Sequence, residues 1–174
     1  MNNRKSILML ILLVFTLVNV SVNSVMAYLA DGDIAHNKIT VGGSNITIDE
    51  EFDPEPIIPG AVITKKVRIK NEGPNNCYVR VRALFTDSDV GKYASIDWNL
   101  SDWEYDAADE YYYYKSVVNV GKTTSYLMTE ITIENDIPEN MIKDVDLIVY
   151  AESYQADGYS DYKEAWADYQ KNDK

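Results

Sequence analysis

The amino-acid sequence predicts one all-β domain, a single β-sandwich of jelly-roll or immunoglobulin-like type with a short C-terminal helix, after an N-terminal signal peptide. Three observations favour this fold class. Short runs in which apolar and polar residues alternate recur along the chain, separated by turn signals such as Gly42-Gly43-Ser44. The chain contains 14 tyrosines but only three phenylalanines, and tyrosine suits strands with one partly solvated face, because its ring can be buried while its hydroxyl contacts water. A length of 174 residues suits one domain.

The N-terminus has the three parts of a secretory signal peptide. Arg4 and Lys5 form a basic start, residues 7–20 are almost continuously apolar, and small residues lead up to Ala27. We therefore expect cleavage between Ala27 and Tyr28 and export of the mature protein. The alternative is an uncleaved membrane anchor, although the apolar run is short for a spanning helix of about 20 residues.

Cleavage at this point divides the chain into a signal peptide (1–27), a β-sandwich domain (28–158) and a C-terminal helix or tail (159–174). The mature part carries 14 basic and 28 acidic residues, so its net charge is 14 − 28 = −14. Such a charge repels nucleic-acid phosphates and anionic lipid headgroups. We therefore expect no nucleic-acid partner, and contact with a membrane only before cleavage.

Alternation along the mature chain indicates seven or eight strands. Residues 63–70 and 78–85 resemble the two strands of an antiparallel hairpin with basic outward faces, joined by a dense turn signal at residues 71–76. We expect a loop-rich insertion over residues 86–110 and a helix over residues 160–170 with Ser160 as its N-cap. The other expected strands are residues 38–41, 45–48, 111–118, 127–133 and 145–152.

The order of several short motifs carries a family resemblance. These motifs are Tyr28-Leu29-Ala30-Asp31, Asn37-Lys38-Ile39-Thr40-Val41-Gly42, Ile46-Thr47-Ile48-Asp49-Glu50, Ile58-Pro59-Gly60, Lys70-Asn71-Glu72-Gly73 and Cys77-Tyr78-Val79-Arg80-Val81. In this order they resemble the TasA and camelysin family, the exported proteins of Gram-positive bacteria that a SipW-type signal peptidase processes. The resemblance implies a jelly-roll protein that is a subunit or accessory of an extracellular fibre or biofilm matrix. It also implies partnership with that peptidase, and self-association or binding to other matrix proteins.

Catalytic chemistry has little support in the sequence. Camelysin-like proteins are described as metalloproteases, but a zinc HExxH site needs two histidines one helical turn apart, and His36 is the only histidine. Cys77 is the only cysteine, which leaves no internal disulfide, and we expect it to be an inert thiol on a strand. We therefore expect a non-enzymatic protein with no catalytic, cofactor-binding or metal-binding residues, and a camelysin-like metalloprotease is the less favoured alternative.

Acidic clusters leave calcium open as a ligand. The groups around Asp31-Gly32-Asp33, Asp49-Glu50-Glu51 and Asp87-Ser88-Asp89 offer the oxygen ligands that Ca²⁺ prefers. None of them has the spacing of an EF-hand loop. Their simpler role is to keep an exported protein in solution.

Aromatic residues support a second hypothesis, an extracellular carbohydrate-binding module. Trp98, Trp103 and the tyrosine run of residues 111–114 are candidate surface aromatics whose faces could stack on sugar rings. The alternative is that alternate tyrosines point inward while the two tryptophans cover an open edge of the sandwich. Exposure of Trp98 and Trp103 distinguishes the two interpretations.

The first segment of the mature chain is a candidate for strand addition to another subunit. Tyr28 and Leu29 lie at the cleavage site, and Ile39 and Val41 form an alternating apolar face. Because this segment starts where the signal peptide ends, it is not free until cleavage. The resemblance implies that it completes the sheet of a neighbouring subunit; the alternative is an ordinary first strand within its own subunit.

Overall fold

A computed structural model describes residues 45–53 and 57–172 of the chain. These residues belong to one compact unit, residues 36–174. The cleavage site at Ala27 and Tyr28, the strand-addition residues Leu29, Ile39 and Val41, and His36 lie outside the described residues. Within the described part of the chain, no helix has the length and apolar character needed to cross a membrane.

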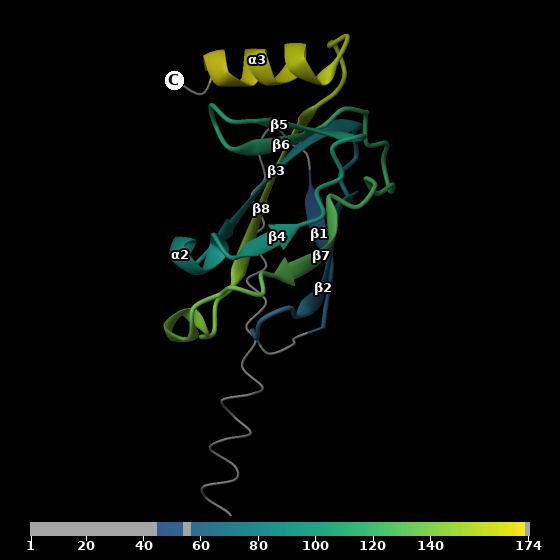
Figure 1. Cartoon of the computed structure of the whole chain (residues 1–174). Helices are drawn as coiled ribbons and strands as arrows, with labels where there is room; N and C mark the ends of the chain where they lie inside the picture. The colour runs from purple at the N-terminus through teal and green to yellow at the C-terminus, as the bar shows by residue number, and fades with distance from the viewer. Residues whose placement is uncertain (1–44, 54–56, 173–174) are drawn as a thin grey trace, which may run out of the picture. The chain divides into compact units, whose positions relative to one another are not determined.

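Eight β-strands and three short helical segments form the described part of the chain (Figure 1). The strands are β1 (Ile46–Phe52), β2 (Val62–Asn71), β3 (Cys77–Phe85), β4 (Ala94–Ile96), β5 (Trp103–Asp106), β6 (Tyr111–Tyr114), β7 (Met128–Ile133) and β8 (Leu147–Gln155). The helical segments are α2 (Ser88–Gly91), the 3₁₀ turn η1 (Glu139–Met141) and α3 (Tyr162–Asn172).

The strands form two antiparallel four-stranded sheets. One sheet has the order β1-β2-β7-β4, and the other has the order β5-β6-β3-β8. The apolar faces of both sheets contribute to one core, an arrangement consistent with the expected β-sandwich. The expected all-β class with a short C-terminal helix is therefore confirmed.

The expected hairpin between residues 63–70 and 78–85 is wrong, because its strands belong to different sheets. Strand β2 pairs with β1 and β7, whereas β3 pairs with β6 and β8. The fully buried Asn71 supports the connection between the sheets: its Nδ2 donates to the carbonyls of Asn75 (2.8 Å) and Val118 (2.9 Å), and its Oδ1 accepts from the Gly73 N–H (2.9 Å). The chain therefore crosses from one sheet to the other where the turn signal suggested a reversal.

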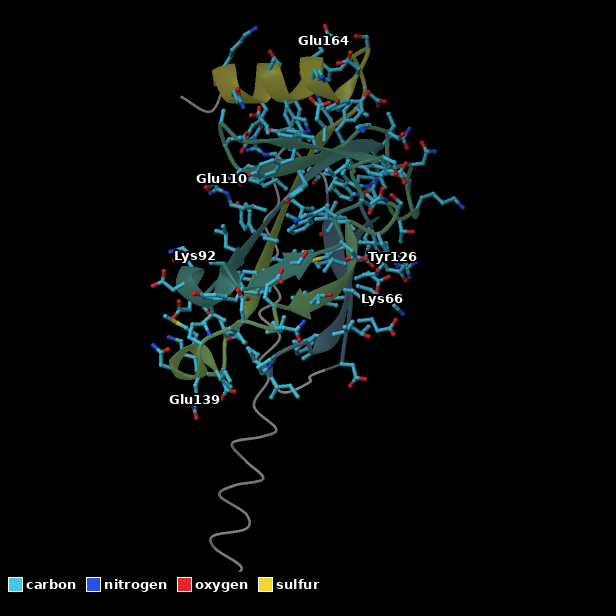
Figure 2. All side chains as sticks on the ribbon, viewed as in Figure 1. Lys66, Lys92, Glu110, Tyr126, Glu139 and Glu164 are labelled. Carbon is cyan, nitrogen blue, oxygen red and sulfur yellow. The ribbon has the colours of Figure 1, made fainter. Side chains whose placement is uncertain are left out.

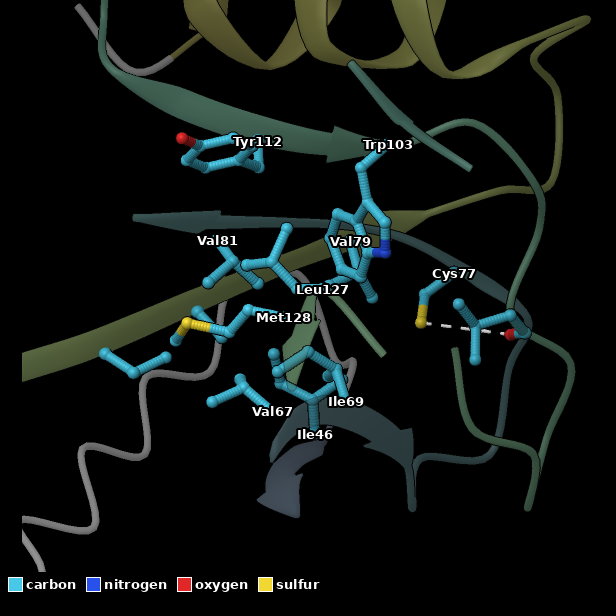
Figure 3. Packing of buried hydrophobic residues seen from close by; sticks show 13 residues of the cluster. Ile46, Val67, Ile69, Cys77, Val79, Val81, Trp103, Tyr112, Leu127 and Met128 are labelled. Carbon is cyan, nitrogen blue, oxygen red and sulfur yellow. Dashed lines mark hydrogen bonds between the residues drawn. The ribbon is translucent and has the colours of Figure 1, made fainter. Parts of the chain in front are cut away.

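The core lies between the two sheets (Figure 3). Val67 and Ile69 of β2 face Val79 and Val81 of β3, and all four side chains are fully buried. Burying one such side chain contributes about 1.5–3 kcal/mol to the free energy of unfolding. The other buried members of this cluster are Ile46, Cys77, Trp103, Tyr112, Val118, Leu127, Met128, Val149 and Ala151.

Helix α3 covers part of the outer face of the β5-β6-β3-β8 sheet. Its aromatic face meets Tyr78 and Tyr113 of the sheet through Trp166 and Tyr169, and Figure 2 shows side chains filling the space between the helix and the strands. The N-cap is Asp161 and not the expected Ser160, since Asp161 Oδ1 accepts from the Glu164 N–H (2.9 Å). The Ser160 side chain donates to the Glu164 carboxylate instead (2.7 Å).

The expected loop-rich insertion over residues 86–110 contains two of the strands. Strand β4 pairs with β7, and β5 pairs with β6. Both are very short, three and four residues, so they offer little alternation for a sequence pattern to reveal. The insertion therefore closes one side of the two sheets.

Candidate functional site

The most elaborate polar arrangement in the described part of the chain surrounds Arg80, under helix α3. Arg80 points from the outer face of β3 and is only 7% exposed. Its Nε donates to Glu152 on β8 (2.5 Å), and its Nη1 donates to the hydroxyl of Tyr113 on β6 (3.2 Å). A carboxylate oxygen of Asp109 lies 3.6 Å from Nη1. The nitrogens of Arg80 on β3 therefore contact side chains from β6, β8 and the turn that contains Asp109.

Aromatic rings enclose the same guanidinium. Its central carbon lies 4.1 Å from the ring centre of Tyr111 and 4.4 Å from that of Trp166, and Tyr169 is slightly farther away at 5.2 Å. Burial acts to lower the pKa of Arg80, but the hydrogen bond with Tyr113 and the charge of Glu152 outweigh it and raise the pKa. The guanidinium stays charged and joins α3 to the sheet.

Tyrosine hydroxyls extend this network to further carboxylates. Tyr113 donates to Asp109, and Tyr150 donates to Glu152 (2.9 Å). Burial, followed by the hydrogen bond to Asp109, raises the pKa of Tyr113 to about 12. The raised pKa values keep the Tyr113 and Tyr150 hydroxyls protonated at neutral pH, and both hydroxyls donate to the carboxylates of the cluster, so the groups beneath α3 bind one another.

An open groove of about 770 Å³ lies beside this cluster. Arg80, Arg82, Asp109 and Tyr111 line it from the sheet side, and the C-terminal part of α3 lines it from the other. Arg82 uses its Nη2 to bind the Asp109 carbonyl (2.5 Å) and the Glu110 carboxylate (3.1 Å). Three cationic side chains, Arg80, Arg82 and Lys171, and the carboxylate of Asp109 line the groove, and both arginines are already paired with glutamates.

The candidate surface aromatics do not form an exposed platform. Trp103 is fully buried in the core between the sheets, so the expectation that it lies on the surface is wrong. Trp98 is half-buried and stacks on Tyr112, with ring centres 4.3 Å apart and planes inclined by 24°. The physical reason is that the acidic segment around Trp103 forms strand β5, which turns the indole inward while Glu104 points toward α3.

The tyrosines of β6 pack alternately into the core between the sheets and into the cluster beneath α3. Tyr112 belongs to the core between the sheets, and Tyr114 packs against it. Tyr113 and Tyr111 belong to the cluster beneath α3. This alternation is the inward packing that the sequence left open as the alternative to sugar stacking.

The acidic clusters within the described residues do not gather into a metal site. Residues 45–53 and 57–172 contain no group of three or more histidine, cysteine, aspartate or glutamate side chains arranged to hold a metal ion. Asp49 and Glu51 of β1 pair instead with Arg68 and Lys66 of β2, and Asp87 caps α2. The cluster around Asp31-Gly32-Asp33 lies outside the described residues.

Cys77 lies in the core and has little reactivity. The side chain is fully buried, and its sulfur lies 3.9 Å from the Val118 carbonyl oxygen (Figure 3). Burial raises the pKa of the thiol to about 12. Since the thiolate is the reactive form, Cys77 has the properties of a structural residue.

The sequence does contain a signal for the Arg80 cluster that alternation alone did not reveal. Arg80 and Arg82 interrupt a valine-rich strand, and the aromatic residues of α3 recur at helical spacing. Cation–π pairing joins such residues when a helix lies on a sheet, but the sequence does not say which strand the helix covers.

No family model, curated protein or solved structure matches this chain.

Proposed function

We propose that the chain is a secreted, non-enzymatic structural protein, a subunit or accessory of an extracellular fibre or biofilm matrix that assembles by strand addition. In this proposal a SipW-type signal peptidase releases the mature protein, and the two sheets form a sandwich of jelly-roll or immunoglobulin-like type. The observation that carries the proposal is the open edge of the two sheets. Strands β1 and β8 end their sheets, and no other strand within the described residues pairs with their outer sides.

An open edge has unpaired main-chain groups that another chain can bind. The outer sides of β1 and β8 present N–H and C=O groups that an added strand satisfies. Residues 28–44 precede β1 directly, and their apolar positions Ile39 and Val41 alternate as an added strand requires. If each subunit donates its segment to the next one, the contact is head-to-tail and produces a filament.

The interior of the domain supports a scaffold more than an enzyme or a sugar-binding module. The Arg80 cluster uses its charged groups to bind one another, and Trp103 is buried. Carbohydrate binding through Trp98 and Trp103 needs coplanar exposed rings, which these two residues do not provide.

The proposal is tested by removing residues 28–37 from the mature protein. We expect a folded protein, by circular dichroism, that no longer forms filaments in electron microscopy and light scattering. A finer test replaces Ile39 and Val41 together by aspartate, which removes the apolar face of the segment. Thr40→Asp is the control, because neighbouring residues of an added strand would face opposite sides, which would place Thr40 away from Ile39 and Val41. Normal filaments from both the truncated protein and the variant with Ile39 and Val41 replaced contradict strand addition.

A further inference from the structure

The four edge strands of the two sheets differ in how well they resist an added strand. Proteins protect sheet edges with very short strands, with charges and with inward-pointing charged residues. Strands β4 and β5 are short, three and four residues. They offer an added strand few main-chain partners.

Strand β1 is protected by charge. It contains Asp49, Glu50 and Glu51 in succession. Glu50 lies opposite Val67, a core residue, so the carboxylate points toward the inter-sheet space, where it pairs with the buried Lys65. An inward-pointing ion pair at an edge is one of the features that discourage pairing with another chain.

Strand β8 has fewer of these protections. It has nine residues, Leu-Ile-Val-Tyr-Ala-Glu-Ser-Tyr-Gln, with no proline, glycine or lysine. All nine pair with β3 without a register shift, so the strand contains no bulge. Its only charged residue, Glu152, is 7% exposed and already bound by Arg80. Ile148 is 43% exposed on the outer face, which makes β8 a long and largely apolar edge.

We propose that β8 is the edge that accepts residues 28–41 of a second copy of the chain, and that β1 is not. This inference rests on the proposed assembly by strand addition and names its acceptor. The 14 residues of this segment exceed the nine of β8. Strand β1 carries three acidic side chains along its edge, each paired with a cation of β2, whereas the one acidic side chain of β8, Glu152, is buried against Arg80.

The place where the segment joins the domain agrees with this acceptor. Residues 28–44 lead into β1 at Ile46, and β1 lies close to β8 at the same side of the two sheets. Strand β1, which follows the donor segment in the chain, therefore lies beside the proposed acceptor edge of its own subunit. Subunits related by a simple head-to-tail step can then repeat the same contact along a filament.

Two matched lysine variants test the acceptor. Ile148→Lys places a charge on the β8 edge, whereas Leu84→Lys places the same charge on its direct neighbour in β3, which is equally exposed at 48% but is not an edge position. We expect Ile148→Lys to raise the protein concentration at which filaments appear, because a charge on an edge strand discourages pairing with another chain, and Leu84→Lys to change it little. Equal effects of the two variants overturn the inference, and thermal unfolding checks that both remain folded.

Cross-linking supplies an independent test that does not depend on lost assembly. Thr40→Cys is combined with Ile148→Cys on β8 or, as the comparison, with Glu51→Cys on β1, which is also exposed. A flexible bis-maleimide should link chains of the β8 pair into ladders. If only the β1 pair gives ladders, or if all links lie within single chains, the inference is wrong. The proposed function still stands in that case, provided that the wild-type protein forms filaments. Failure of the wild-type protein to form filaments overturns both.

Discussion

Replacing Arg80 by methionine should destabilise the domain more than any surface substitution. The change leaves Glu152 without its charged partner beneath α3, and both side chains of the pair are at most 9% exposed. Removing one partner of a buried ion pair costs about 3–5 kcal/mol, because the remaining charge is left uncompensated. A shift of about 2–4 °C per kcal/mol for a domain of this size gives a fall in Tm of about 6–20 °C.

The neighbouring Arg82 provides the matched control. Arg82 also lies on β3 and also pairs with a glutamate, but its side chain is 32% exposed and that of Glu110 is 58% exposed. An exposed pair contributes about 0–1 kcal/mol, so Arg82→Met should lower Tm by only a few degrees.

A double variant separates the buried charge from the packing. Arg80→Met combined with Glu152→Met replaces the pair by apolar side chains, which is often neutral in protein interiors. We expect it to recover most of the stability that Arg80→Met loses, as measured by urea unfolding monitored through tryptophan fluorescence. If Arg80→Met is no worse than Arg82→Met, the cluster does not hold α3 to the sheet as argued.

Three further predictions concern single residues. Trp103→Ala should cost about 3–5 kcal/mol in urea unfolding because the indole is fully buried, whereas Trp98→Ala should cost less; equal costs would contradict their different burial. The Cys77 thiol, whose pKa burial raises to about 12, should not react with a maleimide at pH 8 until denaturant is added, and rapid labelling of the folded protein would contradict this. Burial acts to raise the pKa of Asp97, but hydrogen bonds from Thr129 and the Glu130 N–H outweigh it and hold the pKa below its usual value. The stability that these bonds contribute is present above the usual aspartate pKa of about 4 and is lost as the pH falls through the folded-state pKa. Asp97→Asn should therefore reduce the difference in Tm between pH 7 and pH 3, and an unchanged difference would contradict this role.

Alternation identified most strands but not their partners. The inward positions of β2 and β3 follow from the sequence because each strand has one apolar face. Pairing does not follow from it, since β2 and β3 are adjacent in the chain and still belong to different sheets. At the crossing, the buried Asn71 binds Asn75 and Val118, which lie at sequence distances of 4 and 47, so these contacts are not visible in local alternation.

The short strands β4 and β5 escaped prediction for a different reason. Each has too few residues to show a period, and acidic residues surround Trp103, so the segment resembles an exposed loop. The inward position of Trp103 depends on its pairing opposite Tyr114 of β6. Burial here is set by a tertiary contact that local composition does not encode.

The Arg80 cluster and the proposed acceptor edge are linked through one residue. Glu152 is the only charged residue of β8. Arg80, 72 positions away in the chain, binds that carboxylate on the outer face beneath α3, and Tyr150 donates a second hydrogen bond to it. The interaction that fixes the helix therefore also keeps the only charge of β8 buried. In the proposed assembly, the side chain that stabilises the subunit therefore also keeps β8 without an exposed charge, which favours the addition of a strand at this edge.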